Sequence, residues 1–149
     1  MRAVVQRVRD CSVKVKGEIL GLIERGLLVY LGVERGDDES DISYLAEKII
    51  NLRIIGDAEG KMNLSVLDMN QSLLVISQFT LCADTRKGRR PSYIHAADPV
   101  EAEELYRRFI VEVGRFGLKV EAGKFRAMMD VKYINEGPVT ILLDSKKHF

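Results

Sequence analysis

Residues that build metal centres and disulfide frameworks are scarce in this sequence. Only two cysteines, Cys11 and Cys82, and two histidines, His95 and His148, occur in 149 residues. Two cysteines this far apart in the sequence indicate neither a disulfide framework nor a thiolate metal site, and we expect both to be reduced. Two isolated histidines do not supply the three protein ligands of a catalytic zinc site. The sequence therefore predicts no bound metal and no nucleotide or other cofactor.

Long apolar runs are also missing. No stretch reaches the about 18 apolar residues that indicate a membrane span, and there is no basic segment followed by an apolar one as in a secretory leader. We therefore expect a cytoplasmic protein without membrane contact. A chain of 149 residues has the size of a single domain, here residues 1–149. At this size about 68–70% of the unfolded surface is buried on folding.

An excess of one charge sign is absent as well. The chain has 23 basic and 22 acidic residues and a net charge of +1, whereas a strongly basic domain is typical of nucleic-acid binders. Any RNA contact must therefore be local. The densest basic patch is the segment 86–90, and a smaller one is 146–148. A charge run of this kind is most often only a solvated loop. The candidate RNA contacts of the larger patch are Arg86, Lys87, Arg89 and Arg90.

Hydrophobic periodicity predicts several strands and one helix in the first half of the chain. Valines at or near alternate positions, with breaks at Asp10-Cys11, Lys16-Gly17 and Arg25-Gly26, predict an antiparallel meander. Its strands are expected at 2–9, 12–16, 18–23 and 27–33. Apolar residues at helical spacing, preceded by carboxylates and a hydroxyl in 37–40, predict a helix at 39–51.

A second helix opens at Asp98-Pro99-Val100-Glu101. Asp98 has the position of an N-cap, Pro99 that of N1, and Glu101 is placed to reach back to the N-cap amide. Gly114 or Gly117 can end this helix, and strands are expected near 118–121, 128–134 and 138–143. Strand-rich sequence with two helices and no regular βαβ alternation predicts an α+β fold with mainly antiparallel sheets.

The apolar run that starts at Leu73 ends in side chains that can form hydrogen bonds, Ser77, Gln78 and Thr80. A polar cluster at the end of a strand buried on both faces is a rigid place for chemistry. The alternative is a core strand that simply ends in polar residues. The segment 83–98, which follows, has no period and contains the larger basic patch, and we assign it to substrate contact because long irregular connections are usually functional or mobile.

A second unusual segment is Asn135-Glu136-Gly137-Pro138-Val139-Thr140. Gly137 can adopt backbone angles closed to other residues, and Pro138 fixes its own φ and lacks an N–H. Taken alone, the segment could be an ordinary hairpin turn. Together with Ser77-Gln78-Phe79-Thr80-Leu81, however, it resembles the two signatures of the D-aminoacyl-tRNA deacylase family, Ser-Gln-x-Thr-Leu and Asn-x-Gly-Pro-x-Thr.

The resemblance covers essentially the whole chain. Residues 1–8, 86–92 and 123–131 also look like that family and occur in the expected order. The sequence departs from the family pattern at Arg126, where we expect glycine, and at Met128, where we expect an acidic or polar residue. The resemblance implies a barrel-like, mainly antiparallel sheet with two helices packed outside, in a homodimer.

The family's activity implies hydrolysis of the ester bond of D-aminoacyl-tRNA. The resemblance implies that Gly137-Pro138, with a cis bond, reaches into the partner's site and excludes L side chains. Glycine has no side chain, so glycyl-tRNA is an expected second substrate. The resemblance further implies that Arg7 holds the Gly137-Pro138 segment in place and that Phe125 and Met129 pack on the terminal adenine. The alternatives are a surface strand charge for Arg7 and core contacts for Phe125 and Met129.

Ester hydrolysis needs a nucleophile and groups that stabilise the tetrahedral oxyanion. We expect the main-chain amides of Phe79 and Thr80 to be the oxyanion donors, with the side chains of Ser77, Gln78 and Thr80 shaping the site. Thr80 has no base beside it in the sequence, and an unactivated hydroxyl is a poor nucleophile. We therefore favour a water molecule activated by the free hydroxyl of the terminal ribose, with Thr80 as direct nucleophile the alternative.

Two other classes of protein remain to be tested. A cysteine hydrolase built on Cys82 would need a histidine, and His95 is the only plausible candidate in the sequence. A non-catalytic RNA-binding module would use the basic patch at 86–90 and leave Ser77 to Thr80 without a role.

Overall fold

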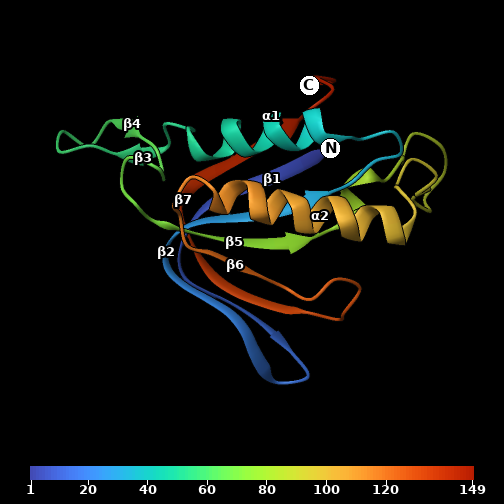
Figure 1. The fold of residues 1–149 in the computed structure, drawn as a ribbon, viewed down its shortest axis with the longest axis horizontal. Helices are drawn as coiled ribbons and strands as arrows, with labels where there is room; N and C mark the ends of the chain where they lie inside the picture. The colour runs from blue at the N-terminus through green and yellow to red at the C-terminus, as the bar shows by residue number, and fades with distance from the viewer.

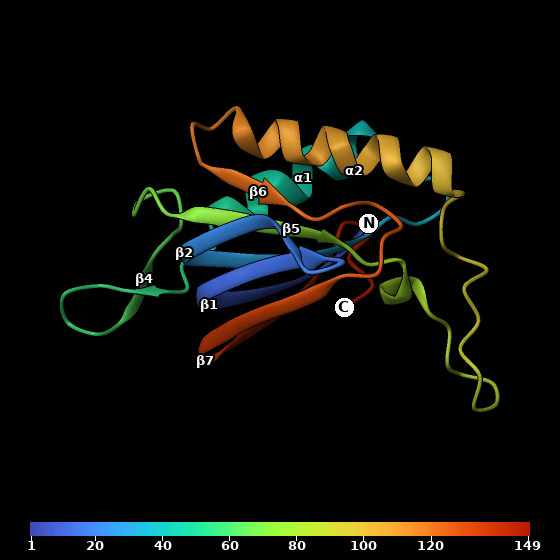
Figure 2. The same ribbon diagram turned by 90° about the horizontal axis from the view of Figure 1, so that it is seen from below.

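The computed structural model of the chain describes residues 1–137 and 139–149. Two helices, α1 (Glu39–Ile50) and α2 (Pro99–Gly114), lie side by side on one face of a five-stranded sheet (Figures 1 and 2). The strand order in that sheet is β6-β5-β2-β1-β7. Its strands are β1 (Arg2–Val15), β2 (Glu18–Gly32), β5 (Ser72–Ser77), β6 (Val120–Ala122) and β7 (Asp130–Asp144). A separate two-stranded sheet contains β3 (Ile55–Gly56) and β4 (Met62–Leu64). Neither described helix is long and apolar enough to cross a membrane.

The breaks predicted in the first four strands bend the chain but do not all end a strand. The strands expected at 2–9 and 12–16 form the single strand β1, in which Asp10 has φ 51°. Those expected at 18–23 and 27–33 form β2, in which Gly26 has φ 147°. A Cβ atom at Gly26 would lie 1.8 Å from the carbonyl oxygen of Ser72, so glycine permits the close approach of β5 to β2. The prediction of four short strands is therefore wrong.

The sheet is mixed and open, and the prediction of a mainly antiparallel barrel-like sheet is confirmed only in its α+β class. Strand β1 pairs antiparallel with β2 and β7, but β5 runs parallel to β2, and β6 parallel to β5. No pairing joins the edge strands β6 and β7 in the part of the chain that the structure describes. Parallel neighbours need a long crossover, usually helical, and α1 and α2 are those crossovers. The sequence pattern did not reveal this alternation of strands and helices. The β3–β4 hairpin separates α1 from β5, and the irregular segment 83–98 separates β5 from α2.

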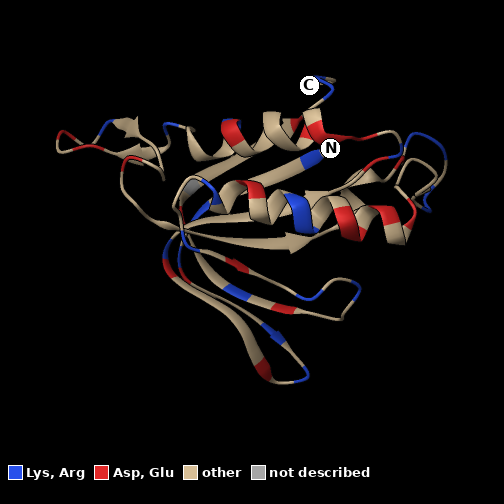
Figure 3. Cartoon of the chain, in the orientation of Figure 1, with Lys and Arg blue, Asp and Glu red and all other residues tan. Residues whose placement is uncertain are grey.

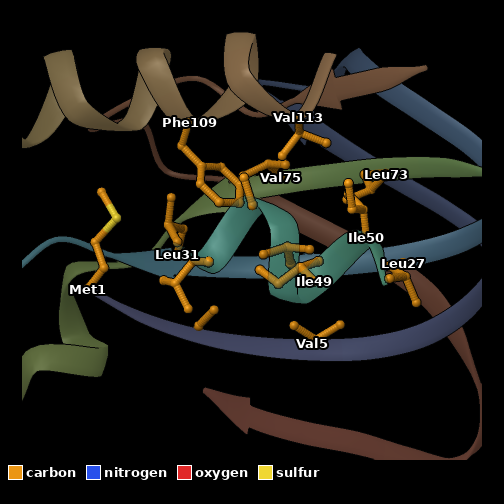
Figure 4. Packing of buried hydrophobic residues seen from close by; sticks show 14 of the residues in the cluster. Met1, Val5, Leu27, Leu31, Ile49, Ile50, Leu73, Val75, Phe109 and Val113 are labelled. Atoms are coloured by element: carbon orange, nitrogen blue, oxygen red, sulfur yellow. The ribbon is translucent and has the colours of Figure 1, made fainter. Parts of the chain in front are cut away.

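One face of the sheet packs against both helices. Figure 4 shows Phe109 and Val113 of α2 above Val75 and Leu73 of β5, with α1 supplying Ile49 beside them. All five side chains are completely buried. Replacing a buried Phe with Ala typically costs about 3–5 kcal/mol, so Phe109 alone contributes strongly to the stability of the fold.

The opposite face of β5 packs on a second core. Leu74 and Ile76 point away from the helices and contact buried residues of the bent β1–β2 hairpin, among them Val8, Cys11 and Ile23. Strand β5 is therefore buried on both faces, as the apolar run predicted, which is typical of parallel strands inside a sheet. Its end at Ser77 is held rigidly by contacts on both sides.

The two helix starts differ in how they are capped. Asp38 Oδ1 accepts a hydrogen bond from the Ser40 amide at 2.8 Å, and the Asp38 amide donates to Asp41 Oδ2 at 2.9 Å, which together form the capping box of α1. Helix α2 begins with Asp98 at N-cap and Pro99 at N1, as predicted, but the Asp98 side chain makes no cap hydrogen bond. The cap interaction predicted there is therefore wrong.

Asp41 links the start of α1 to the C-terminal segment and makes stability depend on pH. Burial alone would raise the pKa of Asp41, but hydrogen bonds from Lys146, Ser145 and the Asp38 amide outweigh it and lower the pKa to about 2, from 3.8. Lys146 Nζ lies 2.7 Å from Asp41 Oδ2. Because the pKa is lower in the folded state, the stabilisation is complete above about pH 4 and is lost as the pH falls toward 2.

We expect Asp41→Asn to lower the free energy of unfolding by about 2 kcal/mol at pH 7. Near pH 2 the difference from the unsubstituted chain should largely disappear, because the carboxyl group is then protonated in the unfolded state and about half protonated in the folded state. Urea unfolding at the two pH values measures this. Glu47→Gln is a matched control, since Glu47 is an exposed carboxylate of the same helix. An equal loss at both pH values would show that the charge of Asp41 is not responsible.

Candidate functional site

A pocket of about 520 Å³ lies at the carboxyl end of β5, beside the start of α2. Three segments line it. The end of β5 contributes Ile76, Ser77, Gln78 and Phe79; the approach to α2 and its first turn contribute Ala96, Ala97, Pro99 and Ala102; the third wall is Phe125, Arg126, Ala127, Met128, Met129 and Val131. Crevices at the carboxyl ends of parallel strands are common ligand sites. The position follows from the parallel pairing of β5.

The strand end continues directly into a short 3₁₀ turn, η1 (Phe79–Cys82). The Gln78 amide donates to the Leu31 carbonyl at 2.8 Å, and the Leu81 amide closes the turn on the Gln78 carbonyl at 3.2 Å. The amides of Phe79 and Thr80 donate to no other main-chain group within the described residues. Phe79 lines the pocket and Thr80 follows it in the turn, so two N–H groups without a main-chain acceptor lie at the positions where the sequence predicted oxyanion donors.

The Thr80 hydroxyl is held by its neighbour. Gln78 Nε2 donates to Thr80 Oγ1 at 2.5 Å, and no other side chain bonds this hydroxyl in the part of the chain that is described. An amide donor cannot accept the hydroxyl proton. Among the described residues, no group that could act as a base is hydrogen-bonded to the Thr80 hydroxyl.

Cys82 and His95 do not form a catalytic pair. The Cys82 thiol is buried, and its Sγ lies 3.4 Å from the Val33 carbonyl oxygen. Burial, followed by the negative charge of Glu34, raises the pKa of this thiol to about 11. His95 lies instead near Asp84, with 4.0 Å between Nε2 and Oδ2. A thiolate nucleophile is disfavoured, and the cysteine hydrolase alternative has no support in the geometry.

Phe125 and Met129 each have one side in the core and another on the pocket. The Phe125 ring lies 5.9 Å from that of Tyr106 and packs on the helix-side core. Met129 packs on the core of the opposite face. Both residues also line the pocket. The core contacts expected as alternatives are present, and they do not prevent either side chain from contacting a ligand.

The Asn135-to-Thr140 segment is a bulge within β7. Gln6 of β1 pairs with Thr140, but Val8 pairs with Asn135, so the residues between them have only Arg7 opposite. The hairpin turn that was the alternative interpretation, with separate strands at 128–134 and 138–143, is therefore wrong. Pro138, for which the family resemblance implies a cis bond and a contact with a partner subunit, lies outside the described residues.

Arg7 and Asn135 hold this bulge from both sides. Arg7 Nε donates to the Glu136 carbonyl at 2.8 Å and its NH1 to the Ile54 carbonyl at 2.6 Å. The Asn135 side-chain amide donates to the carbonyls of Arg7 and Val139, at 3.0 and 3.1 Å. Arg7 is thus not merely a surface strand charge. Gly137 is exposed at the tip of this arrangement.

The bulge and the pocket lie apart within one chain. Arg7 pairs with Leu27 and Leu27 with Leu73, whereas Ser77 pairs with Leu31. The bulge is therefore displaced from Ser77 by four residues along the strands, about 13 Å, and by three strand spacings across the sheet, about 14 Å. The structure brings Ser77, Gln78 and Phe79 together with Phe125 and Met129, but it does not bring Gly137 to them.

The basic patch at 86–90 projects from the body of the protein on a loop (Figures 2 and 3). Paired main-chain hydrogen bonds between Asp84 and Ser92, of 2.7 and 2.9 Å, close its base. Arg86 binds Asp84 through two hydrogen bonds, Nε to Oδ1 at 2.9 Å and NH2 to Oδ2 at 2.6 Å, which lower the pKa of Asp84. No ion pair occupies the other three basic side chains, Lys87, Arg89 and Arg90, among the described residues.

Small residues of the pocket wall were missed from the sequence. Ala96, Ala97 and Ala102 line the cavity, yet alanine has no functional group to mark it as part of a site. Their small side chains leave the space between β5 and α2 open. The only signal was their place: Ala96 and Ala97 lie at the end of the irregular segment assigned to substrate contact, and Ala102 lies in the first turn of the helix that follows.

Comparisons with known proteins agree on one family. The family model described as D-Tyr-tRNA(Tyr) deacylase matches residues 4–144. The chain is 58% identical to a D-aminoacyl-tRNA deacylase of Thermosipho africanus and 57% identical to one of Halothermothrix orenii, in both cases over 149 residues and 100% of each chain.

Two solved structures are similar to this fold. The c-Myc DNA Unwinding Element Binding Protein is 40% identical, with a TM-score of 0.91 over 97% of this chain and 98% of the other. A probable eukaryotic D-amino acid tRNA deacylase is 17% identical, with a TM-score of 0.81 over 95% of this chain and 97% of the other. At that identity the second likeness concerns the fold alone.

Proposed function

The chain belongs to the D-aminoacyl-tRNA deacylase family, and on this premise we propose that it hydrolyses the ester bond of D-aminoacyl-tRNA in the cytoplasm. The products are the free D-amino acid and tRNA. The observation that carries the proposal is the pair of free main-chain amides, Phe79 and Thr80, at the rigid end of β5 beside a pocket. Amide donors in this setting suit the oxyanion that forms when an ester carbonyl is attacked.

The attacking group in this proposal is water. The hydroxyl of Thr80 accepts a hydrogen bond from Gln78, and no base among the described residues is hydrogen-bonded to it, which argues against Thr80 as nucleophile. The free hydroxyl of the terminal ribose lies next to the ester in any aminoacyl-tRNA and can help activate the water. Ser77, Gln78 and Thr80 shape the site, and the side chain of Gln78 keeps the turn that carries the two amides in place.

Selection by chirality requires a second copy of the chain. A pocket that accepts many D side chains cannot recognise each by contact, so it must exclude the L form sterically. We assign this exclusion to the 136–139 bulge of a partner subunit in a homodimer. Three features support this assignment: the bulge lies too far from the pocket of its own chain, it belongs to an edge strand, and Arg7 and Asn135 hold its carbonyls.

A paired assay on D-tyrosyl-tRNA and L-tyrosyl-tRNA tests the function. We expect the D ester to be cleaved at least about 10²-fold faster, since a steric block places the L substrate outside reacting distance. Glycyl-tRNA should be cleaved as well, because glycine lacks the side chain that is excluded. Cleavage of both tyrosyl esters at equal rates would remove the chiral assignment, and tRNA affinity without any ester cleavage would favour the RNA-binding module.

The basic patch at 86–90 should contribute to tRNA affinity through three of its four cations, Lys87, Arg89 and Arg90. We expect the double variant Arg89→Ala/Arg90→Ala to raise KM for D-aminoacyl-tRNA by about tenfold and to weaken its salt dependence. Arg86→Ala is the matched comparison and should change KM by less than about threefold, because Asp84 already engages the Arg86 side chain. Steady-state kinetics at several salt concentrations provides the measurement. A larger effect of Arg86→Ala would show that the ion pair opens to bind RNA.

A further inference from the structure

Arg126 occupies a backbone position that suits glycine. The Ala127 amide donates to the Lys124 carbonyl at 3.2 Å, which closes a turn whose third residue is Arg126, with φ 60°. Phe125, the second residue, is not among the positive-φ residues, so the turn is of type II, in which the third position favours glycine. The glycine expected here from the family pattern has this physical reason. A non-glycine residue held at such a backbone angle often serves a function.

Arg126 is also the only charged residue among those that line the pocket. Its guanidinium is exposed and makes no hydrogen bond or ion pair within the described residues. The rest of the lining is apolar except for Ser77 and Gln78. A single unpaired cation at the wall of a mostly apolar pocket attracts an anionic group of a ligand.

The charges of the proposed substrate indicate which of its groups Arg126 meets. The aminoacyl end carries an α-ammonium group, which a guanidinium repels. The phosphodiester groups of the RNA are anions, and the planar guanidinium binds phosphate with two parallel hydrogen bonds. The phosphate nearest the reacting ester is the one that joins the last two nucleotides.

We propose that Arg126 binds the phosphate between the last two nucleotides of the tRNA 3′ end and so positions the terminal nucleoside against Phe125 and Met129. This inference rests on the proposed function and adds a positioning residue to it. Arg126 contacts the substrate at a distance from the ester, so its loss should weaken binding of substrates that contain the phosphate. Turnover of the bound ester should be unchanged.

The test compares Arg126→Gly and Arg126→Lys on two D-tyrosyl esters, the charged tRNA and the adenosine ester without phosphate. We expect Arg126→Gly to raise KM for D-tyrosyl-tRNA by about fivefold to tenfold with kcat unchanged. The slope of log KM against log salt should fall by about 0.7, the value for one phosphate contact on a single strand. KM for the adenosine ester should not change. Arg126→Lys should retain most of the affinity for tRNA.

Stability provides an internal control. Glycine adopts φ 60° without strain, so the melting temperature of Arg126→Gly should not fall, which separates lost affinity from lost folding. Lys124→Ala removes an exposed cation of the same turn that does not line the pocket, and it should change KM by less than about twofold.

An unchanged KM for D-tyrosyl-tRNA in Arg126→Gly would overturn the inference, as would equal increases in KM for both esters. Affinity for uncharged tRNA provides a readout that does not depend on cleavage. If the unsubstituted chain cleaved neither ester, the proposed function would fail, and weaker binding of uncharged tRNA by Arg126→Gly would still support the phosphate contact. Equal binding of uncharged tRNA by the two chains would refute it.

Discussion

Gly137→Ala is expected to reduce the preference for D-tyrosyl-tRNA over L-tyrosyl-tRNA by about 10- to 100-fold. A Cβ atom at this position would lie 2.9 Å from the Val139 amide nitrogen and 3.1 Å from Asn135 Oδ1. The first distance is shorter than Cβ atoms tolerate and the second is tight, so the bulge must shift. An exclusion made by main-chain atoms depends on their position, and a displacement of about 1 Å can change a rate by about 10². Rates on the two esters under single-turnover conditions give the ratio.

The result should be an increase in L-ester cleavage more than a loss of D-ester cleavage, because the amides proposed to stabilise the oxyanion belong to the other segment. Gly114→Ala is the matched control: a Cβ at this helical glycine meets nothing within 4 Å, and the D/L ratio should remain the same. Sedimentation of each variant shows whether the oligomeric state has changed. A Gly137→Ala protein with the original D/L ratio and the original assembly would refute the role assigned to the bulge.

Thr80→Ala is expected to lower kcat for D-tyrosyl-tRNA by about 10², with tRNA affinity nearly unchanged. The Thr80 hydroxyl accepts the 2.5 Å hydrogen bond from Gln78, and its removal loosens the turn that carries the Phe79 and Thr80 amides. Loss of one oxyanion donor typically costs about 10²–10³ in rate. Single-turnover cleavage together with binding of uncharged tRNA separates the two effects. Equal losses in both would place Thr80 outside the reacting site.

Two further substitutions distinguish the roles that Thr80 could have. Thr80→Ser keeps the hydroxyl and should retain activity within about tenfold, whereas Thr80→Val keeps the shape but should behave like Thr80→Ala. A trapped aminoacyl ester on residue 80 would establish Thr80 as the nucleophile. In its absence, residual activity of Thr80→Ala well above the uncatalysed rate would support attack by water.

Much of the secondary structure was predictable because it depends on local pattern. The helices predicted at 39–51 and from Pro99 were observed as Glu39–Ile50 and Pro99–Gly114, since apolar residues at helical spacing identify a buried face wherever it packs. The Lys16-Gly17 turn was also correctly placed, and both residues have positive φ. The prediction failed where a break in the pattern had two meanings. At Asp10 and Gly26 the chain bends within a strand, and the sequence does not distinguish a bend from an end.

In the candidate site, too, some features were predictable from the sequence and others were not. The motif at Ser77 to Leu81 and the bulge sequence at Asn135 to Thr140 stand out as residues, and the family they resemble was confirmed. Their separation within one chain did not follow from the motifs, because it depends on the register of four strands. The glycine-like backbone of Arg126 became visible only with its φ of 60°.

Composition and periodicity were thus sufficient for the α+β class, both helices and the doubly buried strand β5, whereas the family was indicated by the resemblance of two short motifs. The parallel pairing of β5, the pocket at its carboxyl end and the distance from that pocket to the bulge came from the folded chain. The physical reason is that helix periodicity and turn chemistry involve residues within a few positions of one another. Strand order and register, in contrast, are decided by which distant segments bury apolar surface together.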